Sequence, residues 1–219
     1  MKWVGVALVS EGPTDDRFLP GVIGRSLEDL LAREFDDYVL VGEVIPVQVS
    51  GGPAAVKDYV SALRDNVGSF NIVVFHHDSG ANPNRVAEQW IDPMRREWSE
   101  RGTEDPITFL VPVRETEAWA LADGDALRRV FGVSWSDDEL GIPANPRNVA
   151  GVTDPKKVID GIVTRTSGRR ADYHTRLGEL VDLNRLAAVD AYAEWLRSVE
   201  QQLESSLNLK RIASRRRGR

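Results

Sequence analysis

The feature that most constrains the fold is an alternation of short apolar runs with segments of helical periodicity. Four apolar runs are interpreted as strands, over residues 4–9, 38–49, 71–76 and 106–113. These runs are mostly continuous in apolar character, which is typical of strands buried on both faces of a parallel sheet. The segments between them have apolar residues at the three- and four-residue spacing of amphipathic helices. The sequence therefore predicts an α/β fold, with a mostly parallel four-stranded sheet and helices on both faces.

The character of the sequence changes after residue 122, where strand-like runs stop. Helical periodicity continues over residues 155–163, 173–181 and 189–207. The sequence therefore predicts an α/β core over residues 1–122 and a helical extension, residues 123–209, packed on that core. The last ten residues, 210–219, hold six of the 28 basic residues and no acidic one. This tail is expected to be disordered, either as a solvated chain end or as an arm that contacts nucleic acid.

Several classes of site are excluded by composition. The 219 residues include no cysteine, which excludes disulfide frameworks, thiolate zinc sites and cysteine nucleophiles. The sequence has no glycine-rich phosphate loop of the P-loop or dinucleotide-binding type. It has no apolar stretch of the roughly 20 residues that a membrane span needs. The N-terminus runs into the first strand without a signal-peptide pattern, so we expect a cytoplasmic protein with no membrane partner.

Carboxylates follow three of the expected strands. Glu11 and Asp15 follow the first strand, Asp78 follows the third, and Glu115 and Glu117 follow the fourth. The carboxyl ends of parallel strands meet at one edge of a sheet, so these side chains are expected to lie close together. Neighbouring carboxylates repel one another unless a cation neutralises them, and oxygen ligands suit Mg²⁺ or Mn²⁺. The sequence therefore predicts a site for metal-assisted phosphodiester chemistry.

Structural interpretations compete with this prediction. Asp15 and Asp16 could complement the dipole of the helix that begins there, and Asp78 could be a turn residue. Glu115 and Glu117 are two residues apart and cannot share a helix face, so at most one is expected to point into the site.

Histidines and basic residues add to the site. His76 ends the third strand, where it could be a Mn²⁺ ligand or a strand-end residue satisfied by a backbone partner, and His77 is expected to face outward. Lys156 and Lys157 follow a proline at the start of an expected helix, a position that favours phosphate. Arg169 and Arg170 belong to a basic stretch that could contact a nucleic-acid backbone or form a solvated helix face.

The motifs in this order resemble a known family. Residues 11–15, Glu-Gly-Pro-Thr-Asp, resemble the E-G-x-T-[ED] opening of TOPRIM domains in the form used by OLD-type nucleases. The closer resemblance is to a group of bacterial TOPRIM-like proteins that are thought to act beside ABC-type ATPases. The group has an E-x-E-A-W segment and an N/D-P-K-K segment, which correspond to residues 115–119 and 154–157. The resemblance extends from residue 4 to about residue 203.

The resemblance implies a divalent-metal-dependent nuclease that acts on nucleic acid, DNA rather than RNA, with Mg²⁺ or Mn²⁺ as cofactor. Glu11 would be the general base or a metal-linked acid, and Lys156 would stabilise charge on the phosphate. The implied metal ligands are Glu11, Asp15, Asp78, Glu117 and His76. An ABC- or AAA-type ATPase partner in a defence or repair system would fit this group, and a homodimer is a further option.

The sequence departs from the family pattern at the D-x-D pair expected after the third strand. Either His76 replaces the first acid, or Asp78 is the first acid and the second is lost. In both alignments one carboxylate is missing. The alternative function is therefore a catalytically degenerate TOPRIM-like subunit that serves as an interaction module for an ATPase. A third option is a nucleic-acid-binding protein that uses the basic tail alone.

Overall fold

The structure is a computed structural model that describes residues 2–49, 55–80, 82–100, 102, 105–166 and 172–212. Arg169 and Arg170, which were predicted to contact nucleic acid, lie outside the described residues. So do residues 213–219 of the basic tail.

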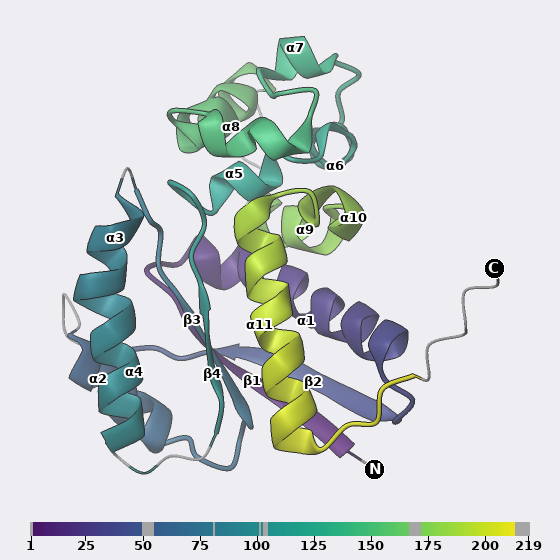
Figure 1. The fold of residues 1–219 in the computed structure, drawn as a ribbon. Helices are drawn as coiled ribbons and strands as arrows, with labels where there is room; N and C mark the ends of the chain where they lie inside the picture. Colours follow the sequence, from purple (N-terminus) through teal and green to yellow (C-terminus); the bar gives the residue numbers. More distant parts are fainter. Residues whose placement is uncertain are drawn as a thin grey trace.

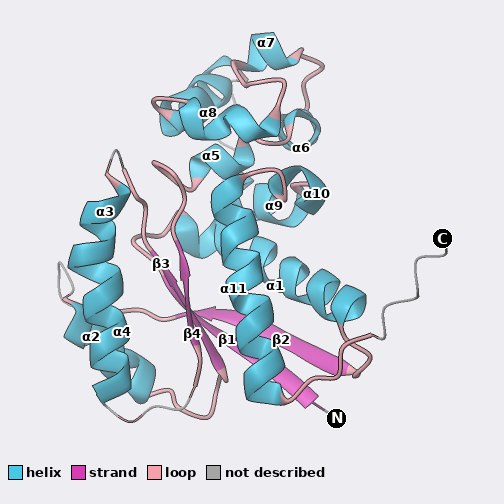
Figure 2. Ribbon diagram, in the orientation of Figure 1, coloured by secondary structure: helices cyan, strands magenta, loops and turns pink. Residues whose placement is uncertain are grey.

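Four parallel strands form the sheet, which confirms the predicted fold class (Figure 2). The order across the sheet is β2-β1-β3-β4, so the first and third strands are neighbours at its centre. The pairing of Val9 with Phe75 brings the ends of these two strands side by side. The strands are β1 (Lys2–Val9), β2 (Val39–Pro46), β3 (Ile72–His76) and β4 (Ile107–Leu110).

Helices cover both faces of the sheet, and each face has its own apolar core (Figure 1). Alternate residues of β1 point to opposite faces, as the pleat of a strand requires. One face packs against α1 (Asp15–Glu34) and α11 (Asp190–Leu207), and the other against α2 (Val56–Arg64) and α4 (Asp92–Glu100). Although α11 comes near the end of the chain, it lies against β4 and buries Tyr192 and Trp195. The predicted helical extension therefore contributes one of the helices that cover the sheet.

Shorter helices occupy the end of the molecule where the strands terminate, above the sheet in Figure 1. Between β3 and β4, residues 83–100 form an α-helical turn, a π-helix and α4 in succession. None of the helices in the described part of the chain is both long and apolar enough to cross a membrane. The remaining segments are α3 (Pro83–Val86), the π-helix η1 (Ala87–Ile91), α5 (Glu117–Ala120), α6 (Gly124–Phe131), α7 (Asp137–Leu140), the 3₁₀-helix η2 (Pro146–Gly151), α8 (Pro155–Arg165), α9 (Tyr173–Leu180) and α10 (Leu183–Leu186).

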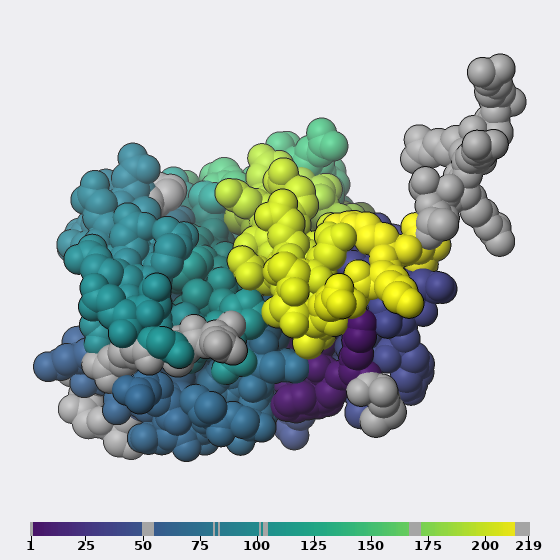
Figure 3. Space-filling model, turned by 60° about the horizontal axis from the view of Figure 1, so that its bottom comes forward, coloured from purple at the N-terminus to yellow at the C-terminus, as the bar shows by residue number. Residues whose placement is uncertain are grey.

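The first residues of the basic tail are held against the start of the chain. The backbone N–H of Asp36 donates to the carbonyl of Lys210 at 2.8 Å, and the N–H of Lys210 donates to the Asp37 carboxylate at 2.6 Å. Arg211 forms ion pairs with Glu200 and Glu204 of α11. Figure 3 shows this yellow segment beside the purple N-terminal strand. Residues 210–212 thus differ from the disorder expected for the tail.

Two glycines allow α1 and α9 to pack closely. A Cβ atom at Gly178 would overlap the carbonyl oxygen of Phe18, and one at Gly21 would lie 2.8 Å from the backbone of Gly178. Arg25 reinforces the contact, because its guanidinium donates to the carbonyls of Gly178 and Val181. This contact holds the C-terminal half of α9 against the N-terminal half of α1.

The Gly178→Ala substitution is therefore expected to destabilise the fold. The added methyl group has to displace backbone atoms, and overpacking of this kind costs about 1–3 kcal/mol of unfolding free energy. Urea unfolding would measure the loss. Gly161→Ala in α8 is the matched control, because a Cβ atom there meets nothing within 4 Å. Equal effects of the two substitutions would contradict the predicted clash.

Candidate active site

Glu11 and Asp78 meet at the carboxyl edge of the sheet, because β1 and β3 are neighbours. The Glu11 carboxylate accepts a hydrogen bond from the backbone N–H of Asp78 at 2.6 Å. Its second oxygen lies 3.3 Å from Nε2 of His77. The Glu11 side chain is 37% exposed, which makes this carboxylate accessible to a ligand from solvent.

The ring of His76 lies between the carboxylates of Asp15 and Asp78. Its side chain is fully buried, and Nε2 lies 2.8 Å from Oγ1 of Thr116 and 3.2 Å from Oδ1 of Asp78. Its other ring nitrogen, Nδ1, lies 4.0 Å from Oδ2 of Asp15 and has no hydrogen-bond partner. The partners of His76 are therefore side chains, and the expected alternative of a backbone partner does not hold.

The contacts among His76, Asp15 and Asp78 shift the pKa values of His76 and Asp15. Burial lowers the pKa of His76, but the hydrogen bond to Asp78 and the charges of Asp15, Asp78 and Glu11 outweigh burial and raise it above the ordinary value. Burial raises the pKa of Asp15, and the charges of Asp78 and Glu11 add to this rise, whereas His76 opposes it. An ionised Asp15 is thus disfavoured without a compensating cation.

Glu117 joins the same group from the start of α5. It lines a small cavity together with Asp15 and Thr116. Burial raises its pKa, and the negative charges of Asp78, Asp15 and Glu115 raise it further. Glu115 has a different role, because its carboxylate accepts a hydrogen bond from the backbone N–H of Lys156 at 3.3 Å. Of the two glutamates, Glu117 is the one placed beside Asp15.

The first turn of α8 presents two lysines next to this group. Asp154 caps the helix by accepting a hydrogen bond from the backbone N–H of Lys157 at 2.9 Å. The side chains of Lys156 and Lys157 are both exposed. The backbone contact between Lys156 and Glu115 holds this helix start against the segment that carries Glu117.

The acidic group has the donor chemistry of a site for a hard cation. Within the described residues, no Lys or Arg side chain forms an ion pair with Asp15, Asp78 or Glu117. No group of three or more His, Asp or Glu side chains in this part of the chain is arranged so that it could hold a metal ion. Mg²⁺, however, is commonly held by one or two carboxylates, with waters and substrate phosphates as its other ligands. Carboxylates on either side of a buried imidazole that lacks one hydrogen bond fit Mg²⁺ or Mn²⁺ by charge and by donor type.

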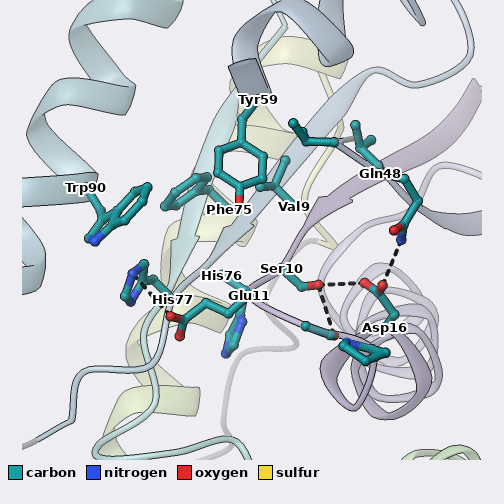
Figure 4. Close-up of a pocket in the computed structure, with 14 residues that line it drawn as sticks. Val9, Ser10, Glu11, Asp16, Gln48, Tyr59, Phe75, His76, His77 and Trp90 are labelled. Atoms are coloured by element: carbon teal, nitrogen blue, oxygen red, sulfur yellow. Dashed lines mark hydrogen bonds and ion pairs between the residues drawn. The ribbon is translucent and has the colours of Figure 1, made fainter. Parts of the chain in front are cut away.

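A cleft with aromatic walls lies next to the acidic group, and Glu11 is between the two (Figure 4). His77, which was expected to face outward, instead lies in this cleft, with its ring 4.8 Å from that of Trp90. Tyr59 and Gln48 also line it, and neither they nor Trp90 belonged to the site expected from the sequence. Trp90 and Tyr59 lie within amphipathic helical patterns, in which an aromatic residue in a cleft has the same signature as one in the core.

Comparisons with known proteins were made for the sequence and the structure. No family model matches the sequence, and no curated protein is similar to it. Among solved structures, the chain is similar to the C-terminal region of the OLD protein of Xanthomonas campestris pv. campestris, with 15% identity and a TM-score of 0.41. The match covers 93% of this chain and 95% of that one.

Proposed function

We propose that the protein is a divalent-metal-dependent nuclease with its active site at the carboxyl edge of the sheet. The observation that carries this proposal is the meeting of acidic side chains from three strand ends, where the pKa values of Asp15 and Glu117 are both raised. Such an arrangement is unfavourable for the protein alone and becomes favourable when a cation neutralises it. Shifted pKa values of this kind cluster at functional sites.

In this proposal, each residue of the site has a distinct role. One or two of the carboxylates of Asp15, Asp78 and Glu117 hold the cation, with waters and the substrate phosphate as its other ligands, and His76 positions Asp15 and Asp78. The bound cation would neutralise charge on the phosphate during the reaction. Glu11, the most accessible of these carboxylates, takes the proton from the attacking water as the phosphorus–oxygen bond to the leaving group breaks. Lys156, with Lys157 beside it, stabilises the negative charge that develops on the phosphate oxygens.

One observation favours the alternative, a degenerate subunit that binds an ATPase partner. Oδ1 of Asp78 already accepts hydrogen bonds from the backbone N–H and the hydroxyl of Thr116, at 3.0 and 3.2 Å, and lies close to Nε2 of His76. A carboxylate satisfied in this way can have a purely structural role.

A cleavage assay separates the two functions. Purified protein would be incubated with labelled single- and double-stranded DNA and with RNA, in Mg²⁺, in Mn²⁺ and in EDTA. We expect cleavage with at least one of the two metals and none with EDTA. If neither metal supports cleavage, with or without an added ATPase partner, the nuclease proposal is rejected and the degenerate subunit becomes the better description.

A further inference from the structure

The cleft beside Glu11 has the size and the walls of a binding site. It encloses about 370 Å³, which is within the range of roughly 300–1,000 Å³ for small-molecule sites. Trp90 and His77 form one wall, with ring centroids 4.8 Å apart, and Tyr59 lies edge-on to Trp90 at 6.5 Å. Figure 4 shows Trp90 and His77 to the left of Glu11, Tyr59 above it, and Gln48 and Asp16 to its right. The side chains of Trp90, His77 and Tyr59 are only partly buried, so part of each ring is accessible from solvent.

The backbone around Trp90 departs from regular helix. Trp90 lies in the π-helix η1, between two α-helical segments. Single π-turns within α-helices are rare and often occur at functional sites. This turn carries the Trp90 ring, which packs against the ring of His77 at an interplanar angle of 38°.

The charges of the cleft exclude a phosphate as its occupant. Glu11 and Asp16 both line it, and no Lys or Arg is among its described lining residues. Ser10 and Gln48 each donate a hydrogen bond to the Asp16 carboxylate, at 2.5 and 2.8 Å. A neutral planar group can stack on the rings, and any N–H groups on its edge would find acceptors in Asp16 and Glu11.

We propose that the cleft binds one unpaired nucleobase next to the phosphate that is cleaved, so that the site acts on single-stranded nucleic acid. This inference rests on the proposed nuclease function and specifies its substrate. Glu11 lies between the two sites, with one oxygen on the N–H of Asp78 and the other beside His77 in the cleft. A base held on Trp90 would place its own phosphate outside the cleft, on the Asp78 side of Glu11, where the proposed cation would neutralise it. Base pairing in a duplex would prevent the base from entering the cleft.

Binding of a fluorescein-labelled 12-nucleotide single strand with phosphorothioate linkages that resist cleavage, measured by anisotropy with the 219-residue chain in Mg²⁺, tests the inference. Stacking of one base on an aromatic side chain predicts that Trp90→Ala weakens binding on the order of tenfold and that Trp90→Phe retains most of it. Tyr38→Ala, at an exposed aromatic that precedes β2 and therefore lies at the amino end of that strand, away from the cleft, is the matched control. Thermal unfolding of each variant shows whether the fold is intact.

A series of strands with one abasic position each gives the decisive readout. We expect one position at which loss of the base weakens wild-type binding by about the same factor as Trp90→Ala. At that position, removal of the base should not weaken binding to Trp90→Ala any further, because the base contributes to affinity through its contact with the Trp90 ring. A flat abasic series, or equal losses in both proteins, would overturn the inference, as would absence of single-strand binding.

The inference and the nuclease proposal fail in different ways. If the protein cleaves nucleic acid but no abasic position weakens binding, the base-binding inference is rejected and the nuclease proposal stands. If one abasic position weakens binding but neither metal supports cleavage, the nuclease proposal is rejected and the base-binding inference stands.

Discussion

Glu11→Gln is expected to reduce metal-dependent cleavage by roughly 10²–10⁴-fold, the usual contribution of a positioned acid or base. The amide oxygen of glutamine can still accept the hydrogen bond from the N–H of Asp78, so the junction of β1 and β3 should remain intact. The substitution removes the negative charge and the ability to take a proton. We therefore expect kcat to fall with little change in thermal stability, which single-turnover kinetics and a thermal melt would measure together.

Glu28→Gln is the control for this experiment. Glu28 is an exposed carboxylate on α1, the helix that also carries Asp15, and it takes no part in the site. Its amide variant should cleave at the wild-type rate. If Glu11→Gln also retains the wild-type rate, Glu11 does not transfer the proton, and the accessible carboxylate of the site has no role in the chemistry.

The fold was largely predictable because its signals are local. Each buried strand is a short apolar run that ends in polar residues, and α1 and α11 have apolar stripes that are visible without tertiary information. The π-helix η1 could not be predicted, because an extra residue in one turn leaves no mark in an apolar pattern. The short helix α7 (Asp137–Leu140) was not predicted either, although Ser136 and Glu139 form a capping box and Gly141 ends the helix.

The acids of the site and His76 were predictable from the sequence, but the contacts among them were not. Their position at strand ends follows from the sequence, but the distance between Glu11 and Asp78 depends on β1 and β3 being neighbours, which no local signal gives. Thr116, which binds both His76 and Asp78, lacks a motif of its own apart from its place between two glutamates. Alternation along β3 means that His76 and His77 point to opposite faces, but only the packing of both faces shows which one is buried.

Mn²⁺ is expected to stabilise the protein strongly at neutral pH. A ligand present at about 100 times its dissociation constant adds roughly 2.7 kcal/mol to the unfolding free energy. For a chain of this size that corresponds to a rise of about 5–10 °C in Tm. The stabilisation arises because the cation removes the cost of ionising Asp15 and Glu117, whose pKa values are both raised. Differential scanning fluorimetry with Mn²⁺, against KCl at equal ionic strength, would measure the shift.

The pH dependence and one variant identify the carboxylates that respond. In the folded protein Asp15 and Glu117 hold their protons more tightly than in the unfolded chain, so without metal their contribution to stability falls as the pH rises through the folded pKa values. The gain from Mn²⁺ should therefore be present at neutral pH and decrease as the pH falls through the folded pKa values of the two groups, which both lie above their ordinary values. Asp15→Asn should raise the Tm without metal, because it removes a buried charge, and should lose most of the response to Mn²⁺, whereas Glu28→Gln should keep both wild-type values. If Mn²⁺ raises the Tm of Asp15→Asn as much as that of the wild type, the cation binds elsewhere in the protein.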